Sequence, residues 1–187
     1  MDHNNLVGTL GPPISSLTSL ITINLSHNYL SGTFGNTLNS LNSLKKFDCS
    51  YNLFSGTVPL LFNSSNLTDL NFQNNDFTQL PTNILPLTAL KTLALSVNPH
   101  LSGTIPSIIN TFTSLENLNL YATQLNGTIP KINSLSQLVI LYSIPYQFND
   151  AFLPSSFALP SLTYLSIQHL KLNTISTIGP FPALQTL

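Results

Sequence analysis

The sequence predicts an α/β solenoid, an arc of stacked repeats whose short parallel strands line the concave face. The first observation is a segment of the form L-x-x-L-x-x-F-x-C-x-x-N-x-F-x-G-x-V-P at residues 41–59, which recurs in related form from Leu17 and from Leu87. The second is one position of this pattern that recurs at steps of 24, 24, 23, 23, 25, 23 and 24 residues. That position is occupied by Asn4, Asn28, Asn52, Asn75, Asn98, Thr123, Tyr146 and Leu170. A period of this size is the sequence signature of repeat proteins, whose stacked units share one core.

The steady register predicts a single solenoid over residues 1–187, with about seven full repeats and a partial unit at each end. Both partial units begin or stop inside the pattern, without the polar cap that solenoids need for solubility. We therefore expect the chain to be a fragment of a larger protein. We also expect end-to-end self-association, because uncapped repeats expose apolar edges.

Each repeat contains an apolar–x–apolar triplet that predicts a short strand. The clearest triplets are residues 23–25, 47–49, 70–72, 93–95 and 118–120. Alternation along a strand directs the apolar residues inward and the residue between them outward. The asparagine that follows each strand is expected to satisfy backbone groups of the next turn with its buried amide. Stacked repeats would then form an asparagine ladder of Asn4, Asn28, Asn52, Asn75 and Asn98.

A segment of the form L-x-G-x-I-P follows the asparagine position in several repeats, as at residues 125–130. With this segment the chain resembles the plant-type leucine-rich repeat (LRR) family, and it is similar to the receptor-like ectodomains of plants and slime moulds. The resemblance implies a second short strand from this segment and a concave sheet that binds other molecules. The return segment on the convex side is short and rich in Ser, Thr and Asn, which predicts one 3₁₀ or helical turn.

Composition limits the classes of partner. Charged residues make up 6% of the chain and the net charge is −1, so the sequence predicts no nucleic-acid binding. No apolar run approaches the ~18 residues of a membrane span, and the N-terminus has no signal-peptide pattern. The resemblance nevertheless implies an extracellular or cell-surface location for the parent protein. Possible N-glycosylation sequons begin at Asn24, Asn63, Asn66 and Asn126.

The sequence holds no motif for catalysis, and we expect neither an enzyme nor a cofactor. No phosphate loop, zinc motif or nucleophile elbow is present. The four histidines lie in different repeats without metal-ligand spacing, so no metal site is predicted. The single cysteine, Cys49, takes a position that is apolar in other repeats and is expected to be buried.

Candidate ligand-binding residues lie at outward positions of the predicted concave strands. Two sets stand out, an apolar and aromatic set in the fifth to seventh strands and a charged set in the second and third. They are Tyr121, Ile140, Tyr142, Ile144 and Tyr164, and Lys46, Asp48 and Asp69. The same alternation also places Ser26, Ser50 and Ser96 outward. A competing interpretation is a one-residue slip of the irregular sixth repeat, which would turn Ile140 and Tyr142 inward.

These features favour a non-catalytic protein- or peptide-binding module from the extracellular part of a receptor-like or secreted signalling glycoprotein. One alternative is a secreted enzyme inhibitor that resembles the polygalacturonase-inhibiting LRR proteins. Such inhibitors tend to have a charged concave face and flanking disulfides, whereas this chain has few charges and one cysteine. A second alternative is an intracellular LRR scaffold, which the lone cysteine allows and the glycine–proline segment disfavours.

Overall fold

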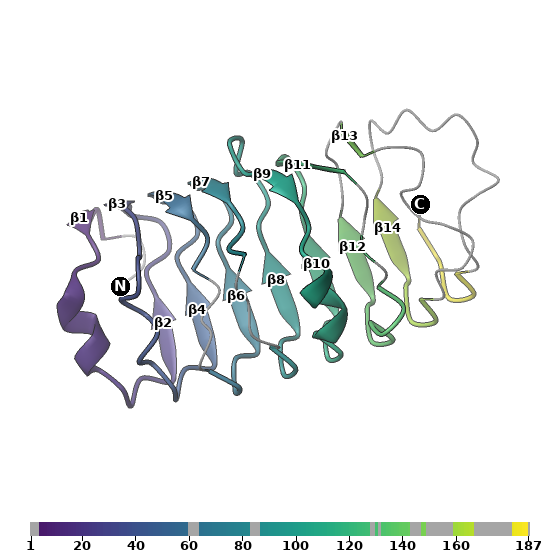
Figure 1. The fold of residues 1–187 in the computed structure, drawn as a ribbon, viewed down its shortest axis with the longest axis horizontal. Coiled ribbons are helices and arrows are strands. Elements are labelled where there is room, and N and C mark those ends of the chain that lie inside the picture. Colours follow the sequence, from purple (N-terminus) through teal and green to yellow (C-terminus); the bar gives the residue numbers. More distant parts are fainter. Residues whose placement is uncertain are drawn as a thin grey trace.

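The computed structural model of the chain describes residues 4–59, 64–82, 87–127, 130, 132–142, 147–148, 159–166 and 181–186. Figure 1 shows an elongated solenoid, with the strands of successive repeats side by side along its long axis. Neighbouring strands pair in parallel in both of its sheets. The predicted solenoid of parallel strands is confirmed.

The first sheet contains seven strands in the order β14-β12-β10-β8-β6-β4-β2. They are β2 (Thr22–Asn24), β4 (Lys46–Asp48), β6 (Asp69–Asn71), β8 (Thr92–Ala94), β10 (Asn117–Asn119), β12 (Ile140–Tyr142) and β14 (Tyr164–Ser166). The central residue of every strand is buried, and its two neighbours are half-buried or exposed, except for the buried Ser166. We call the face with these neighbours the outer face of the first sheet; it is the face predicted to be concave.

The second sheet follows the order β1-β3-β5-β7-β9-β11-β13. Its strands are β1 (Val7–Thr9), β3 (Tyr29–Gly32), β5 (Leu53–Thr57), β7 (Asp76–Gln79), β9 (Ser102–Thr104), β11 (Gln124–Gly127) and β13 (Gln147–Phe148). Most of them come from the glycine-containing segment, as the family resemblance implied. Glycine is needed at Gly56, because its φ is +76° and a Cβ there would lie 2.8 Å from the Thr33 methyl group.

Pairing in the second sheet is weakest between β7 and β9. The two strands pair only at Gln79 and Ser102, whereas β9 pairs with β11 at three positions. Pro99 supplies a physical reason. In other repeats the residue after the ladder position donates its backbone N–H to the preceding repeat, as Tyr29 does to Leu6 O at 2.8 Å, and proline has no N–H.

Two short 3₁₀ helices occur among the described residues, η1 (Pro12–Ser16) and η2 (Ser107–Thr111). They match the helical turn predicted for the return segment. Neither approaches the length of a membrane span, and no other helix in the described part of the chain does so.

The predicted ladder asparagines join neighbouring repeats through both ends of their amides. The Nδ2 of Asn52 lies 3.1 Å from Cys49 O in its own repeat and 2.9 Å from Leu25 O in the preceding one. Its Oδ1 accepts the Leu30 N–H at 2.9 Å. Asn75 and Asn98 form equivalent bonds, whereas Asn28 accepts the Leu6 N–H and donates to Leu25 O of its own repeat; all three are buried. Asn4 is exposed and donates its backbone N–H to Asn28 Oδ1.

The core is continuous and apolar, formed by the inward leucines together with packed phenylalanines. The rings of Phe34 and Phe54 lie 4.5 Å apart, and Phe72 meets Phe77 edge-on at 5.7 Å. Cys49 is fully buried as predicted, and burial raises the pKa of its thiol well above the usual value, with the nearby Asp48 carboxylate as the second cause.

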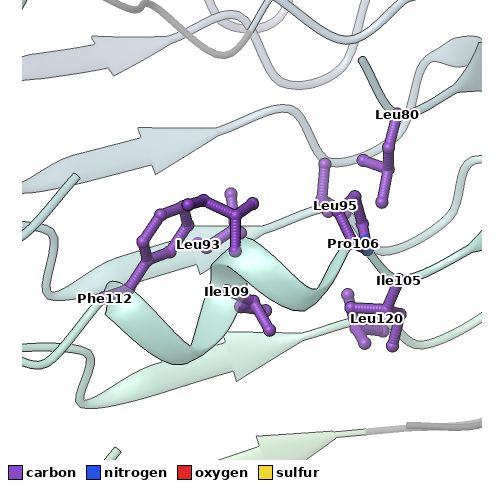
Figure 2. Close-up of a pocket in the computed structure, with 9 residues that line it drawn as sticks. Leu80, Leu93, Leu95, Ile105, Pro106, Ile109, Phe112 and Leu120 are labelled. Carbon is purple, nitrogen blue, oxygen red and sulfur yellow. The ribbon is translucent and has the colours of Figure 1, made fainter. Parts of the chain in front are cut away.

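A small apolar cavity lies beneath η2, and Figure 2 shows it among Leu93, Ile109, Phe112 and Leu120. Its volume is about 20 Å³, and no polar atom lines it. A water molecule needs polar partners as well as space, and a drug-sized ligand needs roughly 300 Å³ or more. This cavity is therefore a packing defect of the core, and function must be sought on the surface.

Candidate binding surface

Two columns of side chains cover the outer face of the first sheet. Each column takes one residue from each strand, with Thr22 of β2 at the start of the first column and Asn24 at the start of the second, because the strands pair without a register shift. The first contains Lys46, Asp69, Thr92, Asn117, Ile140 and Tyr164. The second contains Asp48, Asn71, Ala94, Asn119, Tyr142 and Ser166. Strand spacing of about 4.8 Å places neighbours in a column in contact distance.

The C-terminal strands supply the aromatic part of this face. Tyr142 and Tyr164 are half-buried, and their ring centroids lie 4.9 Å apart at an interplanar angle of 45°. Ile140 is half-buried beside them and pairs with Asn117 of β10. We call Ile140, Tyr142 and Tyr164 the tyrosine cluster.

The register of β12 excludes the one-residue slip. Leu141 is 1% exposed and pairs with the buried Leu118, so Ile140 and Tyr142 point outward as first predicted. Tyr121 is 45% exposed and lies just beyond β10, where its backbone N–H bonds to Asn119 Oδ1 at 3.1 Å. Ile144 lies outside the described residues.

The charged residues gather on the N-terminal strands. Lys46 Nζ lies 3.2 Å from Asp69 Oδ2, and both side chains are substantially exposed. Asp48 accepts the Ser50 N–H at Oδ1 and the Asn71 amide at Oδ2, at 2.9 and 3.2 Å. A shallow groove of about 330 Å³ runs over these strands between Asn24 and Ala94. Exposed pairs of this kind orient a partner more than they add affinity.

Beside this groove, Lys91 Nζ donates to Glu116 Oε1 at 2.9 Å. That hydrogen bond, followed by the attraction of the Glu116 charge, raises the pKa of Lys91. Both side chains are about half exposed, so the pair is a surface feature. No group of three or more His, Cys, Asp or Glu that could hold a metal ion occurs in the part of the chain that the structure describes.

The prediction that Ser26, Ser50 and Ser96 face outward is wrong. All three serines are buried, because the chain leaves the extended conformation after each strand. The following residue adopts a left-handed conformation, as at His27 and Tyr51 with φ of 55°. The serine turns inward, and the N–H of Ser26 bonds to Asn24 Oδ1 at 2.9 Å, as that of Ser50 does to Asp48 Oδ1.

The sequons occupy different surroundings. Asn24 and Asn66 are exposed, whereas Asn126 is half-buried within β11. Asn63 lies outside the described residues. Asn24 already uses Oδ1 to hold Ser26, so its side chain has a structural contact of its own.

The sequence analysis missed a second surface, on the turn between the two sheets. Tyr29 and Leu53, each directly after a ladder asparagine, are both 57% exposed. Tyr51, directly before a ladder asparagine, is 40% exposed and stacks on His27 with ring centroids 4.2 Å apart. The signal available in the sequence was an aromatic or aliphatic residue beside the asparagine in consecutive repeats.

Comparisons with known proteins agree with this architecture. The Leucine Rich Repeat family model matches residues 19–41. The crystal structure of a TDR receptor resembles this chain with a TM-score of 0.68 and 29% sequence identity. The match covers 84% of this chain and 29% of the receptor chain. A plant ice-binding protein is 26% identical with a TM-score of 0.64, over 89% of this chain and 62% of that chain. The chain therefore has the fold of a leucine-rich repeat solenoid.

Within that class, its structural neighbours include plant receptors. The plant peptide hormone receptor RGFR1, solved in complex with RGF2, shares the fold with a TM-score of 0.69 and 24% identity, over 100% of this chain and 34% of that chain. An adenylate cyclase of Schizosaccharomyces pombe is 30% identical over 190 residues, which is 98% of this chain and 10% of the cyclase. The chain thus spans a small part of these proteins, and it shares the leucine-rich repeat fold with the receptor.

Proposed function

We propose that the chain is a non-catalytic module that binds a protein or peptide on the outer face of the first sheet, with the tyrosine cluster as its anchor. The observation behind this proposal is the Tyr142–Tyr164 ring pair, held outward by the register of β12 and β14. Each ring is half-buried and so keeps part of its surface exposed, and adjoining exposed apolar surface is typical of interaction sites. Tyrosine is enriched among residues that dominate binding energy, because it combines a large apolar face with a hydroxyl group.

The neighbouring strands supply polar partners for such a ligand. Asn117 and Asn119 of β10 lie beside Ile140 and Tyr142 in the same two columns. Their amides offer both donors and acceptors to a peptide backbone. The Lys46–Asp69 pair lies farther along the face and would set the orientation of a longer ligand.

The receptor comparisons support an extracellular, receptor-like setting. A plant receptor of this fold is known in complex with a peptide hormone, which indicates that the scaffold can present a peptide-binding face. The TDR receptor, at 29% identity, supports the same setting. These neighbours and the repeat pattern support the proposal of a receptor-like role.

A binding experiment tests the proposal. The wild-type protein is screened against secreted peptides and ectodomains, and each hit is measured again with Tyr142→Ala/Tyr164→Ala. We expect at least a tenfold loss of affinity, because two adjacent aromatic anchors are removed.

The matched control is Lys46→Ala/Asp69→Ala, which changes two residues in the polar half of the same face. We expect a loss below about threefold, because exposed ion pairs contribute little to affinity. Circular dichroism checks that each variant is folded. Full affinity in the folded tyrosine variant would refute the proposed anchor.

A further inference from the structure

The turn between the two sheets forms a groove, which we call the rim groove. Its volume is about 530 Å³, and its walls include Tyr29, Tyr51, Leu53, Asn74, Asp76 and Pro99. It follows the ladder asparagines across the N-terminal half of the solenoid, whereas the tyrosine cluster lies on β12 and β14. The rim groove is therefore a second surface, independent of the proposed peptide site.

The backbone N–H groups beneath this groove are already hydrogen-bonded between repeats. His27, Tyr51 and Asn74 share a left-handed φ of 55°, and each donates its N–H to a carbonyl of the next repeat at 2.9–3.0 Å. The N–H groups of Asn28 and Asn52 are donated in the same way, at 3.1 Å. An incoming peptide thus finds no free strand edge at these positions, and β-strand addition is not available. A ligand must be held by side-chain faces and side-chain polar groups.

A stacked pair of aromatic rings, Tyr51 on His27, is already in place at the groove without a ligand. Tyr51 stacks on His27 at a centroid distance of 4.2 Å and an interplanar angle of 9°. Its hydroxyl oxygen accepts a hydrogen bond from the Gln73 amide at 3.2 Å. The stack and this bond fix the ring before any ligand arrives, which lowers the entropic cost of binding. Tyr29 adds a second, more exposed ring to the same groove.

The polar lining is almost uncharged. Among the described residues that line the groove there is no lysine, and the single charged one is Asp76, whose Oδ1 lies 3.5 Å from His100 Nε2. The described lining therefore offers no lysine ammonium group to pair with an anionic ligand. Amide groups such as that of Asn74 and a carboxylate offer donors and acceptors that suit hydroxyl groups.

From this combination we infer that the rim groove is a binding site for a neutral oligosaccharide. Sugar rings present apolar C–H faces that pack on tyrosine, and hydroxyl edges that bond to amides and carboxylates. The groove spans four consecutive repeats, from Asn28 to Pro99, so it suits a chain of sugars rather than one ring.

Isothermal titration calorimetry with three neutral probes tests the inference: cellohexaose, xylohexaose and N-acetylchitohexaose. We expect at least one hexasaccharide to bind, and its monosaccharide to bind at least tenfold more weakly. Tyr51→Ala and Tyr29→Ala are each expected to lower the affinity about tenfold. Tyr51→Phe is expected to stay within about threefold of wild type, because it keeps the stacking face.

The control is Tyr142→Ala/Tyr164→Ala, which leaves the rim groove intact and is expected to bind the saccharide like wild type. Failure of all three probes to bind would overturn the inference, as would binding that survives Tyr51→Ala/Tyr29→Ala. Binding of a secreted peptide that depends on Tyr51, with no saccharide binding, would also overturn it. None of these outcomes depends on the tyrosine cluster, so the two proposed binding sites are tested independently of each other.

Discussion

Each ladder asparagine fastens two repeats with one amide. Asn98 is the most buried of them, with Nδ2 at 3.0 Å from Phe72 O and 2.8 Å from Leu95 O. Its Oδ1 accepts the Phe77 N–H at 3.2 Å. At the next ladder position Thr123 bonds only to Leu120 O, at 2.9 Å, among the contacts that the structure describes. A threonine therefore replaces part of the asparagine's role within its own repeat.

We predict that Asn98→Ala lowers the free energy of unfolding by about 3 kcal/mol, because it leaves several buried backbone groups unpaired. Asn98→Thr is the matched control, and its loss is expected to be clearly smaller, by analogy with Thr123. Urea denaturation followed by circular dichroism measures both. A cost for Asn98→Ala below about 1 kcal/mol would contradict the role assigned to the ladder.

Among the repeats from β2 to β10, that of β8 lacks the side-chain acceptor that the other four use to hold the turn. Asn24, Asp48, Asn71 and Asn119 each accept the N–H of the residue two positions later, at 2.9–3.2 Å. Ala94 occupies the equivalent position in β8, and the buried Ser96 Oγ has no hydrogen-bond partner. In the first repeat the same hydroxyl, Ser26 Oγ, bonds to Asn24 Oδ1 at 2.7 Å.

Ala94→Asn is accordingly predicted to stabilise the protein by about 1 kcal/mol, because it supplies an acceptor for Ser96. Thr92→Asn, at the other outward position of β8, is the control and should change stability by no more than about 0.5 kcal/mol. Thermal and urea unfolding of both variants measure these changes in stability. An Ala94→Asn protein no more stable than Thr92→Asn would disprove the missing-acceptor explanation.

The buried thiol of Cys49 makes stability depend on alkaline pH. Burial raises the pKa of Cys49 in the folded protein above its unfolded value, so folding favours the protonated thiol. The corresponding stability is present below the unfolded pKa, at about pH 8.5, and is lost as the pH rises toward the folded pKa. We predict a steeper fall in unfolding free energy between pH 8 and pH 10 for wild type than for Cys49→Ala.

Urea denaturation at each pH measures this difference in slope. Thiol labelling of the native protein provides a second check, since a fully buried, protonated thiol should react only after unfolding. Equal pH slopes for the two proteins, or rapid labelling of the native state, would contradict the prediction.

Residue identity alone did not predict the turn geometry. Left-handed φ values of 53–55° occur at His27, Tyr51, Asn74, Val97 and Ala122, and these residue types share no left-handed preference. The conformation is imposed by the repeat, through hydrogen bonds between neighbouring turns. Simple alternation beyond the strand therefore assigned the serines to the wrong side.

At the scale of elements, the first sheet is regular and the second is interrupted. The strands of the first sheet were predictable because their central residues follow a fixed period, and even the irregular β12 keeps its register. The second sheet loosens between β7 and β9, where Gln79 stands in place of the usual glycine and Pro99 removes a donor. The 25-residue step after Asn98 located this irregularity in the sequence, but its effect on pairing required the structure.

We predict that this junction opens more readily than its neighbours. Amide hydrogen exchange of the segment around β9 should be faster than that of the segment around β3, because fewer backbone bonds hold it to the preceding strand. Mass spectrometry of peptic fragments resolves the two segments. Equal protection of β9 and β3 would show that side-chain packing compensates for the missing pairs.

At the scale of the whole molecule, one scaffold presents two unlike surfaces. The outer face of the first sheet is charged on its N-terminal strands and aromatic on β12 and β14. The rim groove lies on the turn between the sheets and combines aromatic rings with uncharged polar groups. The sequence predicted the first surface, because strand alternation assigns its residues. It did not predict the second, because that surface depends on turn conformation and on contacts between repeats.

If the tyrosine cluster contacts the ligand, a bound partner should slow hydrogen exchange of the strands that carry it. A partner selected with the wild-type protein is added, and peptic fragments that contain β12 and β14 are compared with one that contains β2. We expect slower exchange on β12 and β14 in the complex and no change on β2. Protection confined to the second sheet or to η1 and η2 would contradict it.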